Sequence, residues 1–217
     1  MTRPRVLIAD DHAILLDAFR KLLEPQYDVV GTVTDGQALV KAAEALKPDV
    51  ILADISMPKL NGLDAAERLR ARMPNAKLLF LTVSEDPDVA AEAIRRGAAG
   101  YLLKKSASAE LFEALRAVLR GRTYVTPAIA REPIAVFVST AKRAGPARNL
   151  GLRQREVLQL LAEGKSMKEA AEVLGLTPRT IAFHKYAMME QLGLKSGAEL
   201  VQHAVKIGLV ARAAAVR

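Results

Sequence analysis

Five short apolar runs, separated by amphipathic stretches, constrain the fold of residues 5–121 more than any other feature of the sequence. The runs are VLIAD, VVGTV, VILAD, KLLFLTV and YLLK, at residues 6–10, 29–33, 50–54, 77–83 and 101–104. They are rich in Val, Ile and Leu without polar alternation, which is typical of strands buried on both faces of a parallel sheet. The intervening and following stretches favour helices at 13–23, 36–46, 62–72, 87–96 and 108–120. This order predicts an α/β domain, a doubly wound (βα)5 parallel sheet over residues 5–121.

The pattern changes after residue 121. Residues 122–147 contain several prolines and no sustained period, so we interpret them as a linker. Residues 148–212 predict a smaller all-α domain of four helices, with the last three near 167–174, 178–192 and 197–207. Thr177 and Pro178 suit the N-cap and first position of the third of these helices. A short turn at Gly175-Leu176 separates it from the second helix, which is a helix-turn-helix arrangement.

The charge is divided unevenly between the two parts. Residues 1–121 carry 17 basic and 17 acidic side chains, whereas residues 122–217 carry 15 and 7, which accounts for the whole net charge of +8. A basic domain attached to a neutral one indicates a polyanionic partner, either nucleic acid or an anionic membrane. A solvated basic surface without a partner is the alternative that charge alone leaves open.

Composition excludes several classes of protein. The chain has no cysteine, which rules out disulfides, thiolate zinc sites and a cysteine nucleophile. No apolar run approaches the ~18 residues of a membrane helix, and two carboxylates within the first 11 residues argue against a secretion signal. We therefore expect a cytoplasmic protein that does not bind membranes. The three histidines, His12, His184 and His203, are too scattered to predict a metal site of their own.

Polar side chains gather where the predicted strands end. In open α/β sheets ligands bind at the carboxyl ends of the strands, at a switch in strand order. If the order is 2-1-3-4-5, a common one for doubly wound sheets, that edge brings together Asp10, Asp11, Asp54, Thr82 and Lys104. Three neighbouring carboxylates need a cation, and oxygen ligands favour Mg²⁺. Each residue alone has an ordinary structural explanation, but the five together predict a phosphoryl-accepting carboxylate.

The motifs VLIADDH, VILADISMPKLNGLD, LFLTVSED and GAAGYLLKK resemble the receiver domain of two-component response regulators. The resemblance covers about residues 5–121 and implies that a histidine kinase phosphorylates Asp54. It also implies a Mg²⁺ site formed by Asp11, Asp54 and the Ser56 carbonyl, with Asp10 acting through water. Thr82 and Tyr101 resemble the switch pair, and Lys104 would contact the phosphoryl group. Two flanking serines, Ser56 and Ser84, would tune the lifetime of the phosphoryl group.

The segment REVLQLLAEGKSMKEAAEVLGLTPRTIAFHKYAMMEQLGLKSGAEL resembles the LuxR-type DNA-binding domain, and the whole chain resembles the NarL/FixJ group of response regulators. On the third helix, Ile181, Met188 and Leu192 are spaced to face the core. The resemblance implies that this helix enters the major groove, with DNA contacts from Arg179, Thr180, Phe183, His184, Lys185 and Tyr186. We expect His184 and Lys185 at phosphates, and Phe183 and Tyr186 at base edges or thymine methyls.

The last predicted helix commonly forms the dimer contact in this group, which implies Val201, Ala204 and Val205 at an interface between two copies. Family members often carry lysine at the position of Ala182 and a basic or polar residue at that of Tyr186. A target DNA sequence therefore cannot be carried over from relatives.

The preferred hypothesis is a transcription factor that accepts a phosphoryl group on Asp54 and then changes its dimerisation and promoter binding. Its expected partners are a histidine kinase, promoter DNA and a second copy of the chain. A dehalogenase-like phosphatase is the enzymatic alternative, but such enzymes have D-x-D at the nucleophile and Ser56 occupies the third position here. We thus expect no dedicated enzyme, although slow hydrolysis of its own acyl phosphate fits the site. A receiver used only for dimerisation is the third possibility, and the complete acid, threonine and lysine set argues against it.

Overall fold

The computed structural model describes residues 3–129 and 150–210, which form two compact units. The N-terminal unit contains the elements from β1 to β6, and the C-terminal unit contains α7 to α10. Most of the predicted linker, residues 130–147, lies outside the described residues. Within the described ranges, no helix combines the length and apolarity needed to cross a lipid bilayer.

The N-terminal unit is built on a parallel sheet with the order β2-β1-β3-β4-β5-β6. Its strands are β1 (Arg5–Ala9), β2 (Asp28–Val33), β3 (Val50–Ala53), β4 (Lys77–Thr82), β5 (Gly100–Leu103) and β6 (Tyr124–Val125). The four residues of β3 and of β5 are all buried, as expected of strands covered on both faces. The predicted doubly wound fold and its strand order are confirmed.

A sixth strand is the difference from the predicted set of five. Tyr124 and Val125 pair in parallel with Gly100 and Tyr101. Two residues are too few to show a periodic pattern, so the sequence offers no strand signal there. The strand forms because the edge of β5 offers backbone groups with which it can pair. This short strand falls inside the range assigned to the linker.

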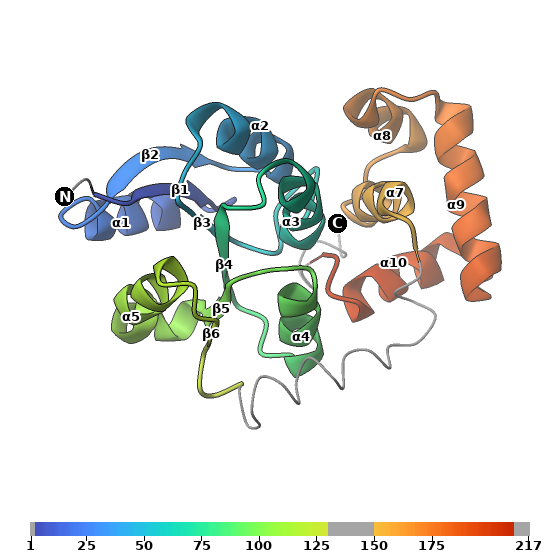
Figure 1. The fold of residues 1–217 in the computed structure, drawn as a ribbon. Coiled ribbons are helices and arrows are strands. Elements are labelled where there is room, and N and C mark those ends of the chain that lie inside the picture. Colours follow the sequence, from blue (N-terminus) through green and yellow to red (C-terminus); the bar gives the residue numbers. More distant parts are fainter. Residues whose placement is uncertain (1–2, 130–149, 211–217) are drawn as a thin grey trace. The chain divides into compact units, whose positions relative to one another are not determined.

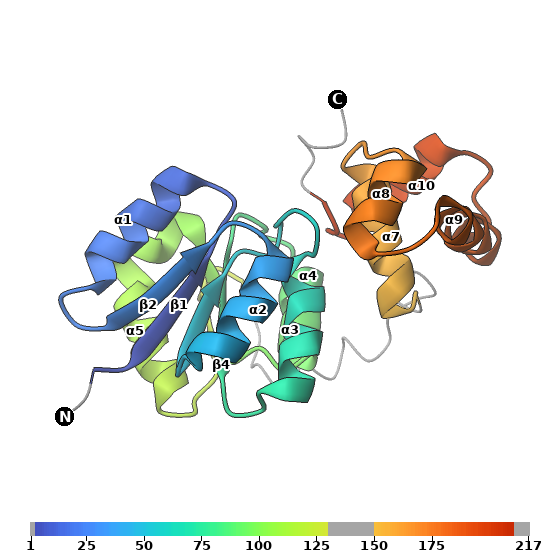
Figure 2. The same ribbon diagram turned by 90° about the horizontal axis from the view of Figure 1, so that it is seen from above.

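Helices cover both faces of the sheet. They are α1 (Ala13–Leu23), α2 (Gly36–Leu46), α3 (Gly62–Arg72), α4 (Pro87–Arg95) and α5 (Ala107–Leu119), with a short 3₁₀ turn, η1 (Lys104–Ser106), before α5. Figures 1 and 2 show α1 and α5 on one face and α2, α3 and α4 on the other. The larger core cluster joins apolar residues of α1 and α5 to the central strands, including Phe19, Leu52 and Leu115. Burial of these apolar side chains stabilises the sheet and so fixes the positions of the residues at the carboxyl ends of its strands.

Four helices form the C-terminal unit: α7 (Leu152–Ala162), α8 (Met167–Leu174), α9 (Pro178–Leu192) and α10 (Gly197–Lys206). Ser166 and Glu169 form a capping box at the start of α8. Gly175 ends α8 in the left-handed region, at φ +63°, which turns the chain within two residues towards α9. Thr177 caps α9 by accepting a hydrogen bond from the Thr180 N–H. These local signals produce the predicted helix-turn-helix.

Candidate functional site

Two buried carboxylates share one ammonium group at the carboxyl edge of the sheet. Asp10 follows β1 and Asp54 follows β3, and these strands are neighbours in register, with Ala9 opposite Ala53. The backbone N–H of Asp54 also donates to the Ala9 carbonyl at 2.8 Å. Nζ of Lys104, just after β5, lies 2.7 Å from Oδ2 of Asp10 and 2.9 Å from Oδ2 of Asp54. The structure therefore brings together three residues that are 44 to 94 positions apart in the sequence.

Burial and charge act in opposite directions on this cluster. Burial raises the pKa of Asp54, and the attraction of Lys104 offsets this only in part, while the negative charge of Asp10 adds to the rise. Burial disfavours the ammonium form of Lys104, but attraction to Asp54 and Asp10 outweighs it, so the pKa of Lys104 is raised. Lys104 thus stays charged at neutral pH. The Ile55 N–H, 2.7 Å from Oδ1, also stabilises the ionised form of Asp54.

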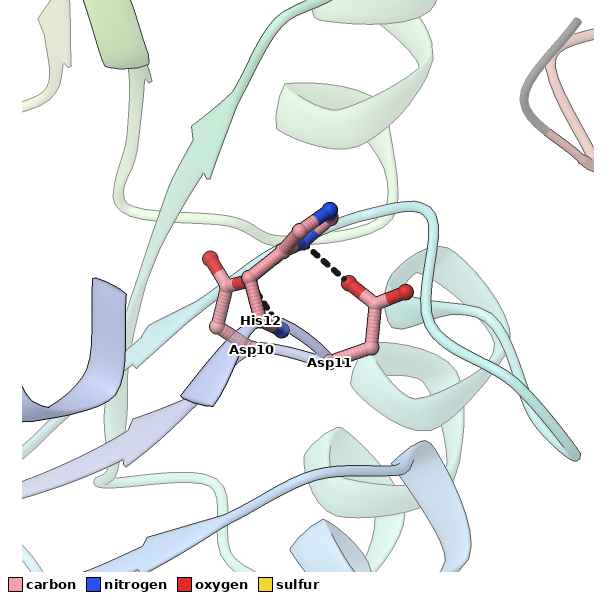
Figure 3. A group of neighbouring side chains, drawn as sticks. All are labelled: Asp10, Asp11 and His12. Carbon is pink, nitrogen blue, oxygen red and sulfur yellow. Dashed lines mark hydrogen bonds and ion pairs between the residues drawn. The ribbon is translucent and has the colours of Figure 1, made fainter. Parts of the chain in front are cut away.

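Asp10 also belongs to a second group of possible metal ligands, which it forms with Asp11 and His12 between β1 and α1 (Figure 3). Nδ1 of His12 lies 2.8 Å from Oδ1 of Asp11 and 3.1 Å from Oδ1 of Asp10. The backbone N–H of His12 also donates to Asp10 Oδ1 at 3.0 Å. Asp10 is buried, whereas Asp11 and His12 are exposed and accessible to an incoming ion. The carboxylate oxygens are donors that suit a hard cation such as Mg²⁺.

Thr82 and Tyr101 lie on neighbouring strands and are fully buried. The Thr82 hydroxyl oxygen accepts the N–H of Ser84 at 3.2 Å, and the same hydroxyl interacts with the Tyr101 hydroxyl. The Tyr101 hydroxyl donates to the Ser84 carbonyl at 2.8 Å. The ring is therefore inward in this state, and the loop after β4 is tied to β5.

Two further residues shape the loop after Asp54. Ser56 lies two residues beyond it and is half-buried, so its carbonyl belongs to the same loop. Gly62 begins α3 so close to that loop that a Cβ atom would collide with the Asp54 carbonyl oxygen. Its N–H donates to the Ile55 carbonyl at 2.7 Å. Only glycine allows this approach without moving the backbone that carries Asp54.

Helix α9 presents a second candidate surface, in the other unit. Arg179, Phe183 and Tyr186 are exposed, whereas Ile181 and Met188 are fully buried. This division matches the predicted core and surface of the helix.

Three predicted contact residues of α9 are less available than expected. Thr180 shares its hydroxyl with that of Thr177 at 2.9 Å. His184 is half-buried, with its ring 5.7 Å from that of Phe183. Lys185 follows Ile181 by one helical turn, so its side chain runs beside the core, and Nζ lies 3.9 Å from where a Cβ on Gly197 would be.

The predicted interface residues of α10 divide in the same way. Val201 and Val205 are half-buried, but Ala204 is fully buried in the core cluster of the C-terminal unit. Ala204 follows buried Leu200 by four residues, which places both on the inward face of the helix. We therefore no longer expect the Ala204 side chain to contact a second copy.

Sequence reasoning missed two participants. Nδ1 of His12 contacts both Asp10 and Asp11, and its place directly after these acids in the sequence is a signal that could have indicated it. The Ser84 carbonyl, which accepts the Tyr101 hydroxyl, is a backbone group, and no residue type in the sequence marks it.

Two family models match the chain. A response regulator receiver domain matches residues 6–116, and the luxR family of bacterial regulatory proteins matches residues 148–204. Oxygen regulatory protein NreC of Staphylococcus aureus strain MRSA252 is 38% identical over 210 residues, which cover 93% of this chain and 97% of the relative.

Solved structures of RcsB are similar over nearly the whole chain. RcsB of Salmonella typhimurium is 27% identical, with a TM-score of 0.66 over 95% of this chain and 99% of that one. RcsB of Salmonella enterica serovar Typhimurium, bound to a promoter in the presence of phosphomimetic BeF3⁻, is 28% identical. That structure has a TM-score of 0.63 over 94% of this chain and 100% of its own.

Proposed function

This chain belongs to the NarL/FixJ group of two-component response regulators, with a receiver domain followed by a luxR-family DNA-binding domain, and we propose that phosphorylation of Asp54 controls its output. Members of this family are regulators and not dedicated enzymes. We assign residues 5–121 to the receiver, 122–147 to a linker whose first residues add β6 to the receiver sheet, and 148–212 to the DNA-binding domain.

The observation that carries the proposal is the ammonium of Lys104 between the carboxylates of Asp10 and Asp54. Asp54 is 4% exposed, and burial of an ionised carboxylate without a partner would strongly destabilise the folded state. A cation placed against it stabilises the charged nucleophile and can later contact a phosphoryl oxygen at the same place.

The chemistry requires few groups. An Asp54 oxygen attacks the phosphorus of a phosphohistidine on the kinase, an O–P bond forms, the N–P bond breaks, and the histidine nitrogen leaves with the electron pair and takes up a proton. Lys104 stays within reach of the charge that the phosphoryl group adds. The Thr82 hydroxyl can donate its proton to a phosphoryl oxygen. Slow attack by water on the acyl phosphate would reverse the modification.

Receiver domains bind Mg²⁺ at their acidic cluster, and the oxygen donors of this one fit that ion. We propose that Asp11, Asp54 and the Ser56 carbonyl would hold it, with Asp10 acting through water. The ion would supply positive charge to the transferring phosphoryl group.

The output side of the proposal is a dimer on DNA. RcsB, a structural relative, has been solved as dimers bound to DNA. A single helix-turn-helix makes few contacts, and two copies on half-sites gain affinity through linkage. We propose that phosphorylation favours the dimer, with Val201 and Val205 of α10 contributing to the contact.

Mass spectrometry of the intact protein tests the acceptor. After incubation with acetyl phosphate and Mg²⁺, the wild type should gain one phosphoryl group that Asp54→Asn removes. Asp86→Asn, which changes an exposed acid after β4, should label as the wild type does. Equal labelling of Asp54→Asn would refute the assignment.

DNA binding tests the output. Fluorescence anisotropy with a randomised duplex pool should show binding by the full chain at low salt. For a pool enriched on the phosphorylated protein, we expect about tenfold tighter binding when Asp54 is phosphorylated, a difference of about 1.4 kcal/mol. No binding of any duplex at low salt would contradict the proposed function.

A further inference from the structure

The exposed stripe of α9 consists mainly of aromatic surface. Phe183 and Tyr186 are 69% and 60% exposed, and they lie three residues apart on the same side of the helix as Arg179. Large exposed hydrophobic side chains are few among the described residues, and these are the two largest of them. Exposed aromatic rings favour a binding role over a packing role, because a core position would have buried them.

The stripe has few groups that can read a base by hydrogen bonds. Bidentate readout of base edges uses Arg, Lys, Asn or Gln, and in the first two turns of α9 Arg179 is the exposed residue of these types. Lys185 is turned towards Gly197, as described above. Ala182, which lies between Arg179 and the two aromatic residues in the sequence, adds only a methyl group. The stripe is therefore suited to apolar contact along most of its length.

Local contacts hold both rings in place on the surface. The Phe183 ring meets the His184 ring edge to face, at 67° and a centroid distance of 5.7 Å. Nζ of Lys185 lies 5.6 Å from the centroid of the Tyr186 ring, within the range of a cation–π contact. Side chains with two rotatable bonds and such neighbours lose little freedom on binding, so the surface is partly pre-organised.

The major groove offers one apolar group to such a surface, the 5-methyl group of thymine. We propose that Phe183 and Tyr186 recognise thymine methyls, so that the chain discriminates its DNA half-sites mainly by apolar contact, with Arg179 as the one strong hydrogen-bonding reader. This inference rests on the proposed function. DNA is the occupant because the whole net charge of +8 lies in residues 122–217 and the stripe lies on the second helix of the helix-turn-helix.

Replacing thymine by deoxyuridine tests the proposal, since it removes the methyl group and leaves every hydrogen-bonding edge intact. A randomised duplex pool is enriched on the full-length phosphorylated protein, and the enriched pool is then amplified with either dTTP or dUTP. Fluorescence anisotropy measures both forms at one salt concentration. Each lost methyl contact should weaken binding about fourfold, or about 0.8 kcal/mol. The dependence of affinity on salt should stay the same, because phosphate contacts do not change.

Variants assign the effect to the two rings. Phe183→Ala and Tyr186→Ala should each reduce the difference between the thymine and uracil pools. Tyr186→Phe, the matched control, keeps the ring and should keep most of the difference. Circular dichroism checks that each variant is folded, and both side chains are exposed enough to be changed without opening the core.

The outcomes separate the inference from the function on which it rests. Equal affinity for the two enriched pools would overturn methyl recognition and leave DNA binding intact. Unchanged discrimination in both alanine variants would likewise overturn the assignment to these rings. A failure to bind any duplex at low salt would remove the proposed function and the inference together, and would point to a protein partner for the stripe.

Discussion

Nζ of Lys104 lies 2.9 Å from Oδ2 of Asp54, across the carboxyl ends of two strands that are separated by β4 in the sheet. The same nitrogen contacts Asp10, so one cation balances two buried carboxylates. This relationship links the stability of the receiver to its chemistry. If one of the three groups loses its charge, the electrostatic energy of the other two buried groups changes.

Lys104→Ala should destabilise the receiver by about 3 kcal/mol at neutral pH without added metal, since it leaves two buried carboxylates without their cation. Lys105→Ala is the matched control, because Lys105 pairs on the surface with Glu85, both more than half exposed, and should cost less than about 1 kcal/mol. Denaturant unfolding of the full chain measures both. The loss in Lys104→Ala should shrink as the pH falls and Asp54, whose pKa is raised by burial, is protonated. Similar losses for the two variants would exclude a special role for Lys104.

Lys104 should also be needed for phosphorylation of Asp54 to promote dimerisation. Some phosphorylation of Lys104→Ala is expected, because the nucleophile is intact, but the phosphoryl group has lost its contact with the residue that follows β5. Analytical ultracentrifugation of phosphorylated wild type and variant should then show weaker dimerisation of the variant. Identical dimerisation would reject this coupling role.

Asp54→Asn should change how stability depends on pH. The folded state raises the pKa of Asp54 above 3.8, mainly through burial, so folding favours its protonated form. This contribution is complete below about pH 3.8 and is lost as the pH rises through the folded-state pKa. The asparagine variant has no such loss. Its melting temperature relative to wild type should therefore increase from about pH 4 upwards and then level off.

Thermal unfolding of both proteins over a pH series tests this dependence. Asp49→Asn serves as the control, because Asp49 is exposed and its carboxylate accepts the N–H of Arg5 at the opposite edge of the sheet. A constant difference between Asp54→Asn and wild type across that series would show that Asp54 does not titrate as the structure indicates.

Arg179→Ala should weaken DNA binding more than Lys185→Ala, contrary to the expectation from sequence that Lys185 contacts phosphate. Arg179 is exposed in the first turn of α9, whereas the ammonium of Lys185 lies beside Tyr186 and Gly197. Loss of one DNA contact from arginine should cost about tenfold in affinity. Fluorescence anisotropy over a salt series compares the variants. A larger loss and a reduced salt dependence in Lys185→Ala would show that this lysine rotates onto the phosphates when DNA binds.

The sequence by itself determined the elements and their order. Apolar runs without alternation marked β1, β3 and β4. Gly175 and the Thr177-Pro178 pair marked the turn before α9, because these signals are local. The rule that ligands bind at strand ends then selected Asp10, Asp54 and Lys104 as neighbours. The family resemblance added the roles that we propose for them.

Only the tertiary structure decided which side chains meet and which way they point. The Lys104 bridge, the Tyr101 hydroxyl on the Ser84 carbonyl and the pairing of β6 with β5 all join segments distant in sequence. Lys185 and Ala204 turned towards the core of their unit because helical periodicity places them one turn from Ile181 and Leu200, and packing of α7 against α9 and α10 selects that side as the inside. A local pattern specifies a face of a helix, but the partner that covers this face exists only after the helices have packed.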